Sequence, residues 1–329
     1  MIEKSKTYNN TSQYTHESKN CVIGSMGNYF SNFNSKFDDS FCFFVLEKFV
    51  LSYTKSGKNV SDIHISHHVA EAYSDLAAKF GLESDLRKST RHNLKKLLLC
   101  KNTPLIIELN SRNLSYHHLY KTNKWNFPHF ITILELNNNN AVISDCYIPK
   151  INDSEIYEGK ADIKNLQKAW KKGGYWYYDS LNVSEFISEF IIDYNFCKTL
   201  FNKNISTLLN SSIPTQELFA KDFSNYLNLY DIKDIKKNLQ NICIQIQALG
   251  LIASRYYLKK YLITHLQFQN SEFINFIDTD INEWHKICLA IYKCTLTCSK
   301  ESFDQVQKLI INISEKERNI YSKLQQKIN

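Results

Sequence analysis

The sequence predicts an α+β fold, in which helices precede an antiparallel sheet in the N-terminal part and the C-terminal part is entirely helical. Short runs rich in β-branched and aromatic residues gather between residues 103 and 181, whereas the runs after about residue 181 are long and have helical periodicity. The 329 residues include only 8 Gly and 4 Pro, which favours long helices over a turn-rich all-β fold. We therefore expect two domains, at residues 1–180 and 181–329.

Helical patterns are expected between about residues 31 and 100. The run FCFFVLEKFVLSYT at 41–54 opens with consecutive apolar residues. The run SHHVAEAYSDLAAKFG at 66–81 has apolar residues at helical spacing and a stop at Gly81. The run SDLRKSTRHNLKKLLLC at 84–100 predicts a further helix with a basic outer face.

The expected sheet begins with TPLIIELN at Thr103–Asn110 and continues with HFITILELN at His129–Asn137. A turn at Asn137–Asn140 joins the second run to AVISDCY as a hairpin, and GGYWYYDSL at Gly173–Leu181 adds another strand. Helical patterns then cover residues 184–209, 233–266, 281–298 and 314–329. We expect these later helices to form the second domain and to cover the active-site cleft of the first.

The composition restricts the classes of protein to consider. The N-terminal residues are polar, and no run of 18 apolar residues is present, so we expect neither a signal peptide nor a membrane span. The 9 cysteines are scattered without a CxxC pair, which is typical of a reduced cytoplasmic protein. A net charge of +7 and no basic-aromatic motif argue against nucleic-acid binding. No Cys or His pair has convincing zinc spacing, and we expect no metal or cofactor.

The stretch NCVIGSMGNYF, residues 20–30, contains the first candidate catalytic residue. If a helix starts here, Cys21 lies in its first turn, where the helix dipole and the free N–H groups favour a thiolate and can hold an oxyanion. The alternative is that Cys21 is a small buried packing residue, as most free cysteines are.

A thiolate nucleophile needs a base, and the base needs a group that orients it. His129 starts a predicted strand, and Asp145 lies on the next one. A hairpin turn near residue 137 would place the two opposite each other, about 4.5–5.5 Å apart between Cβ atoms. His117 and His118 are rival bases in a loop. The alternative interpretation is a surface histidine and an unrelated aspartate at a strand end.

The order of these residues resembles the papain-like cysteine proteases. NCVIGSMGNYF, CKNTPLIIELNSRNLSYHHLY and NFPHFITILELNNNNAVISDCYIP are together similar to the butirosin H N-terminal family of papain-like acyltransferases, as are the later segments SRYYLKKYL, NEWHKICLAIY and SEKERNIYSKL. The resemblance implies a papain-like N-terminal domain, a helical C-terminal domain and a catalytic triad of Cys21, His129 and Asp145.

The sequence departs from this pattern at two positions. Papain-like proteases have an oxyanion-hole glutamine about half a dozen residues before the cysteine, whereas here Gln13 lies eight residues upstream. Asn20, Ser18 or the backbone N–H of Cys21 are the alternatives. Asn110 stands where the family tends to have an acidic residue at the end of a strand.

The resemblance implies formation of an amide without ATP, in natural-product biosynthesis. An acyl chain on the phosphopantetheine arm of a carrier protein would pass to Cys21 and then to an amine. A narrower resemblance, to amide synthetases of the closthioamide type, implies a diamine acylated at both ends. The alternatives are a peptidase, amidase or thioester hydrolase with the same triad, and a helical binding module without catalysis. Aromatic residues near the site are the candidates for substrate binding: Tyr116, Tyr120, Trp125, Phe127 and Tyr147.

Overall fold

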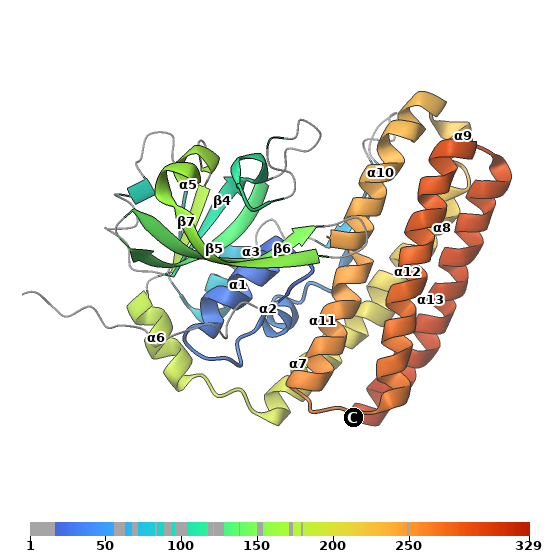
Figure 1. Cartoon of the computed structure of the whole chain (residues 1–329). Helices are drawn as coiled ribbons and strands as arrows, with labels where there is room; N and C mark the ends of the chain where they lie inside the picture. The colour runs from blue at the N-terminus through green and yellow to red at the C-terminus, as the bar shows by residue number, and fades with distance from the viewer. Residues whose placement is uncertain are drawn as a thin grey trace, which may run out of the picture. The chain divides into compact units, whose positions relative to one another are not determined.

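The computed structural model describes residues 17–55, 63–67, 72–82, 84–88, 94–95, 104–117, 121, 128–137, 139–149, 154–170, 174–178, 180–248 and 250–329. It combines helices with antiparallel sheets, as the predicted α+β class requires (Figure 1). The chain divides into two compact units, one formed by Met1–Asp38 and Leu82–Ser188 and the other by Asp39–Gly81 and Glu189–Asn329. We call them the sheet unit and the helical unit.

The sheet unit is built on a six-stranded antiparallel sheet with the order β3-β8-β4-β5-β6-β7. The turn between β5 and β6 lies where the sequence predicts it, because Asn137 pairs with Asn140. Two strands of this sheet, β3 and β7, were not expected from the sequence. The bounds of the strands are β3 Ser84–Lys88, β4 Leu105–Asn110, β5 Pro128–Asn137, β6 Asn140–Pro149, β7 Ser154–Asp162 and β8 Gly174–Tyr178.

Helix α1, Cys21–Ser31, packs against β5 and β6, and every one of its residues after Cys21 is buried. Two polar contacts fix it to the sheet: Thr132 Oγ1 donates to the Ser25 carbonyl at 3.0 Å, and Asn28 Nδ2 donates to Ser144 Oγ at 2.6 Å. The approach is close at Gly24, where an added Cβ would lie 2.2 Å from Cys146 Sγ. Only glycine therefore fits at this point of the helix.

The other face of the sheet carries a separate apolar cluster that includes Leu105, Ile107, Ile131 and Ile143. Helix α5, Ile163–Ala169, contributes residues to this cluster, and the short 3-10 helix η2, Ser111–Asn113, packs against α5. Helix α6, Ser180–Glu189, ends the unit. Alternate residues of β5 thus face α1 and the apolar cluster, as the two-residue period of a strand requires.

The predicted helix at residues 84–100 is wrong at its start, because Ser84–Lys88 is strand β3. This strand pairs with β8, for example Asp85 with Tyr177. The predicted helix at 41–54 is likewise wrong at its end. It ends at Val45 in α2, Asp39–Val45, and Leu51–Lys55 is strand β1, paired with β2, Ile63–His67. In both places pairing with a distant strand overrides the local helical pattern.

Residues 39–81, which the sequence analysis places in the first domain, belong to the helical unit. Aromatic packing accounts for this assignment. Phe43 and Phe44 of α2 stack on Tyr257 and Tyr261 of α11, with ring centroids 4.7 and 3.7 Å apart. Helix α3, Ala72–Phe80, ends at Gly81 with a φ of 63°, so the predicted glycine stop is confirmed.

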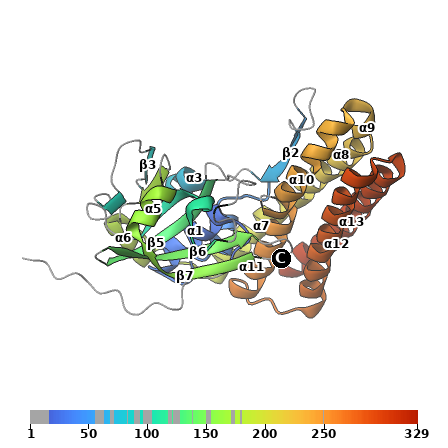
Figure 2. The same ribbon diagram turned by 45° about the horizontal axis from the view of Figure 1, so that its top comes forward.

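Long helices make up the rest of the helical unit, and Figure 2 shows α12 and α13 side by side. A buried ionic network lies inside it: the Arg255 guanidinium donates to both carboxylate oxygens of Glu317. No helix in the described part of the chain has both the length and the apolar character needed to cross a membrane. The bounds are α7 Tyr194–Thr207, η3 Leu208–Ser212, α8 Ile213–Phe223, α9 Tyr226–Leu229, α10 Ile232–Ala248, α11 Leu251–Thr264, α12 Ser271–Thr297 and α13 Lys300–Ile328.

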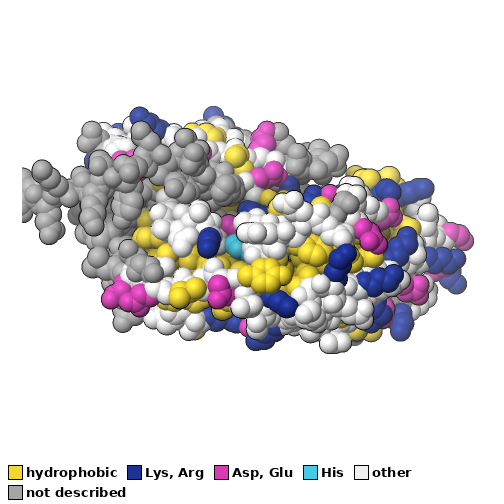
Figure 3. Space-filling model, turned by 90° about the horizontal axis from the view of Figure 1, so that it is seen from below, with side chains coloured by type: hydrophobic (Ala, Val, Ile, Leu, Met, Phe, Trp, Pro, Cys, Tyr) yellow, Lys and Arg dark blue, Asp and Glu magenta, His cyan; other side chains and the backbone are white. Residues whose placement is uncertain are grey.

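Figure 3 shows one face of the molecule, on which lysine and arginine side chains of the helical unit alternate with aspartate and glutamate. The described residues of this face therefore present no continuous basic stripe, which is the usual feature of a nucleic-acid-binding surface.

Candidate active site

Cys21 is the first residue of helix α1, as the sequence predicts, and its side chain is half-buried. Asn20 caps the helix, because its Oδ1 accepts hydrogen bonds from the N–H groups of Val22 at 2.8 Å and Ile23 at 3.1 Å. An asparagine cap is among the most favourable for starting a helix. The cap and the packing of α1 on the sheet thus fix the position of the thiol.

His129, near the start of β5, and Asp145, in the middle of β6, are brought together. His129 Nε2 lies 2.8 Å from Asp145 Oδ2, and the two residues are only 5% and 0% exposed. A buried carboxylate this close to an imidazole is stable only if it is well hydrogen-bonded. Asp145 meets that condition, because the Tyr147 backbone N–H also donates to its Oδ1 at 3.3 Å.

The register of the hairpin differs from the one assumed in the sequence analysis. Thr132 pairs with Ser144, and the ladder is irregular between Ile133 and Glu135. Continuing that register would place Asp145 opposite Ile131, so Asp145 is a diagonal neighbour of His129. The prediction that the two lie directly opposite is therefore wrong by two residues. Because side chains alternate with a period of two, an offset of two keeps both on the same face.

The electrostatics connect His129 with Cys21 as well as with Asp145. Burial by itself would lower the pKa of His129. The Asp145 carboxylate, together with a hydrogen bond and a charge interaction with the Cys21 side chain, raises this pKa to about 10. Since Asp145 occupies Nε2, the nitrogen left for the thiol is Nδ1. With this pKa, His129 is an imidazolium at neutral pH.

Tyr116, predicted to bind substrate, has a different position. Its hydroxyl donates to Asp145 Oδ2 at 3.1 Å, the same oxygen that contacts His129. Its ring stacks on that of Tyr157 with centroids 4.0 Å apart and planes 5° from parallel. Burial, and then the neighbouring carboxylate, raise the pKa of Tyr116 well above its ordinary value, so the phenol stays a donor. Tyr116 thus holds the carboxylate in place.

Tyr147, the other described aromatic candidate, lies near Cys21. Burial raises its pKa, and the charge of Cys21 raises it further. The remaining predicted substrate-binding residues, Tyr120, Trp125 and Phe127, lie outside the described residues, as do Gln13 and His118.

His117, a rival base in the sequence analysis, lies beside the site. Its ring is 2% exposed and meets the His129 ring edge to face, with centroids 5.4 Å apart. The sequence signal for Tyr116 and His117 was their position in the segment after β4. That segment approaches the site because Leu109, at the end of β4, pairs with His129.

Of the residues predicted to stabilise an oxyanion, Asn20 uses its side-chain oxygen to cap helix α1. Ser18 is fully buried, and its N–H donates to the Cys146 carbonyl at 2.9 Å. Among the described residues, none accepts a hydrogen bond from the Cys21 N–H. That N–H lies in the first helical turn, beside the sulfur, where an oxyanion would be held.

The described residues include no group of three or more His, Cys, Asp or Glu side chains placed to hold a metal ion. Neither a search of protein-family models nor a search of curated proteins finds a match for this chain.

Proposed function

We propose that this protein is an ATP-independent acyltransferase that forms amide bonds, with a papain-like sheet unit as its catalytic part. The observation that carries the proposal is the buried His129–Asp145 pair beside Cys21. A thiol on a helix start, an imidazole on a strand and a carboxylate behind it are the parts that thiol-based acyl transfer requires. The carrier-borne acyl donor and the amine acceptor are taken from the sequence resemblance.

In the first step, the Cys21 thiolate attacks the carbonyl carbon of an acyl thioester. A new sulfur–carbon bond forms, the bond to the donor sulfur breaks, and the departing thiolate takes a proton from the His129 imidazolium. The product is an acyl-Cys21 thioester. One thioester replaces another, so the step needs little free energy and no ATP.

In the second step, an amine attacks the acyl-Cys21 carbonyl and His129, now neutral, accepts its proton. The carbon–sulfur bond breaks, the amide leaves, and the Cys21 thiolate with the His129 imidazolium is restored. In both steps the Cys21 N–H is placed to stabilise the negative oxygen of the tetrahedral intermediate. Asp145, held by Tyr116, keeps the imidazole oriented and stabilises its charge.

The first test is intact-protein mass after incubation with a small acyl thioester such as an acyl-N-acetylcysteamine. We expect one adduct on the wild type, none on Cys21→Ala and one on the control variant Cys298→Ala, whose half-buried cysteine lies in the helical unit. An adduct of undiminished size on a folded Cys21→Ala would refute the assignment of the nucleophile.

The second test is the ratio of amide to free acid formed with a millimolar amine. Water is present at about 55 M, so an amine must win by positioning and by greater nucleophilicity. We expect mostly amide, and with a diamine a product acylated at both ends. Mostly free acid across a panel of monoamines and diamines would reject the synthetase and establish a thioester hydrolase or amidase with the same residues.

A further inference from the structure

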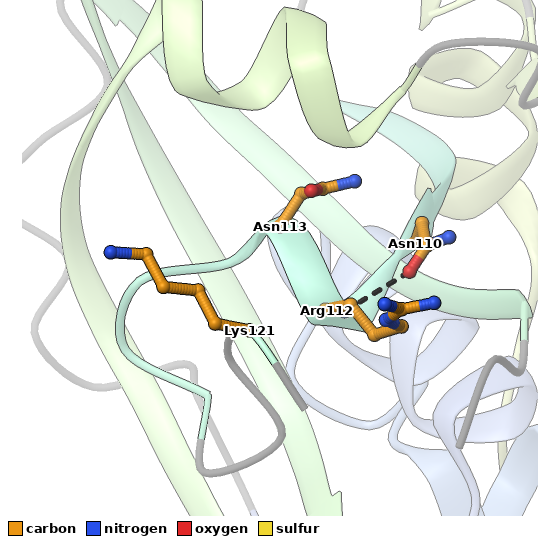
Figure 4. Close-up of a pocket in the computed structure, with 4 residues that line it drawn as sticks. All are labelled: Asn110, Arg112, Asn113 and Lys121. Atoms are coloured by element: carbon orange, nitrogen blue, oxygen red, sulfur yellow. Dashed lines mark hydrogen bonds between the residues drawn. The ribbon is translucent and has the colours of Figure 1, made fainter. Parts of the chain in front are cut away.

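A polar cavity of about 360 Å³ opens in the sheet unit and is lined by Asn110, Arg112, Asn113 and Lys121 (Figure 4). These four residues supply two cations and two amides, with no carboxylate among them. Arginine presents a planar fork of N–H donors that matches phosphate oxygens, whereas Lys121 extends on the other side of η2 and adds positive charge to the surroundings. The lining is therefore suited to an anion.

The backbone around the cavity is held in a defined shape. Asn110 Oδ1 accepts a hydrogen bond from the Arg112 N–H at 3.1 Å, which caps η2. The Lys121 N–H donates to the Arg112 carbonyl at 3.0 Å, which ties Lys121 to η2. Lys121 has a φ of 61°, in the left-handed region that lysine seldom adopts. Figure 4 shows the Arg112 side chain beside Asn110, with Lys121 extending on the other side of η2.

The cavity shares one segment of chain with the candidate active site. Asn110 pairs with Pro128, the residue before His129. The same segment continues from Arg112 to Tyr116, whose hydroxyl contacts Asp145. Leu109 pairs with His129, and Asn110 is the next residue, so the Cα atoms of Asn110 and His129 lie within about 10 Å of each other. An extended pantetheine arm spans more than that distance.

We propose that this cavity binds the phosphate of a phosphopantetheine arm and so selects the acyl donor. The inference rests on the proposed function, which requires a thioester on such an arm. The cavity is larger than a single phosphate needs, and its size is typical of small-molecule sites, so it also accommodates the start of the arm. The arm can belong to a carrier protein or to coenzyme A, since both place the same phosphate at the same distance from the sulfur.

Asn110 has a specific part in this proposal. An aspartate at this position would cap η2 equally well, because asparagine and aspartate are comparable caps. It would also bring a negative charge to the lining of the cavity and repel a phosphate. Asn110→Asp should therefore weaken phosphate binding without lowering the stability of the fold. Arg112→Gln removes the guanidinium, and Lys160→Gln, on the exposed side of β7, is the control for loss of one positive charge.

The direct test is binding to the full chain carrying Cys21→Ala, so that catalysis plays no part. Isothermal titration compares 4′-phosphopantetheine with pantetheine, which lacks the phosphate. We expect phosphopantetheine to bind at least about tenfold more tightly, as one charge-assisted contact would give. Asn110→Asp and Arg112→Gln should remove this preference with the melting temperature unchanged for Asn110→Asp, and Lys160→Gln should keep it. Equal binding of the two probes would overturn the inference.

A kinetic test identifies the source of the arm. Rates of acyl-Cys21 formation are compared for an acyl-coenzyme A, an acyl-phosphopantetheinyl-serine peptide and the phosphate-free acyl-N-acetylcysteamine. We expect Asn110→Asp to raise the KM for the phosphate-bearing donors by about tenfold and to leave the N-acetylcysteamine donor unchanged. Equal changes for all donors would refute the site. A phosphate preference in binding without any adduct would keep the site and reject the proposed acyl transfer.

Discussion

Replacing Asp145 by asparagine tests the charge relationship at the centre of the site. The variant keeps the shape of the side chain and removes its negative charge. In the wild type burial lowers the pKa of His129, and Asp145, followed by Cys21, raises it to about 10. An opposite charge this close shifts a pKa by about 1–3 units. The pKa of His129 should therefore fall by about that amount in Asp145→Asn. This fall corresponds to a loss of about 1.4–4 kcal/mol in the free energy that favours the imidazolium over the neutral imidazole.

The assay is a histidine NMR titration of the wild type, Asp145→Asn and the control Glu135→Gln. Glu135 is exposed and lies on the same strand as His129, so its loss should leave the titration unchanged. Acyl-enzyme formation should be weakened less by Asp145→Asn than by His129→Ala, since an amide still orients the imidazole but nothing replaces the proton carrier. An unchanged pKa of His129 in Asp145→Asn would refute the reasoning, as would equal and total losses of activity in two folded variants.

The same pKa predicts how stability depends on pH. The folded pKa of His129 lies above the value of about 6.5 expected in the unfolded chain. The resulting stabilisation is therefore complete below about pH 6.5 and is lost as the pH rises through about 10. Its size is at most about 5 kcal/mol. Urea unfolding from pH 6.5 to 10 should show the stability difference between wild type and Asp145→Asn shrinking as the pH rises, and a constant difference would contradict this.

Three further changes have defined outcomes. Tyr116→Phe removes a hydrogen bond to Asp145 and should slow acyl-enzyme formation by about tenfold without changing the KM for a small thioester; a change in KM alone would indicate substrate contact instead. Gly24→Ala forces a Cβ against the sheet and should lower the free energy of unfolding by about 1–3 kcal/mol, and no loss in urea unfolding would show that α1 is less closely packed. Glu317→Gln removes the nearer of the two carboxylates beside the buried Arg255 and should cost about 3–5 kcal/mol, whereas a near-neutral effect would show that Asp280, 3.5 Å away, takes over as the charge partner.

Several features of this protein could be predicted from the sequence because they depend on neighbouring residues. The helix start at Asn20–Cys21 follows from a cap and an apolar run, and the end of α3 follows from Gly81, which adopts a positive φ. The hairpin at Asn137–Asn140 follows from turn residues between two β-rich runs.

Other features were decided only by the tertiary structure. Ser84–Lys88 became a strand because β8 pairs with it, and residues 39–81 joined the helical unit because their aromatic rings stack on α11. These contacts link distant parts of the chain, and no local pattern encodes them.

The candidate site depends both on local sequence and on tertiary contacts. The residue types and their order predicted Cys21, His129 and Asp145 as candidates. The two-residue period of a strand kept the last two on one face although the predicted register was off by two. The sequence could not show that Tyr116 holds the carboxylate, or that Arg112 and Lys121 line one cavity with Asn110. Those positions depend on contacts between residues that are distant in the chain, which no local pattern encodes.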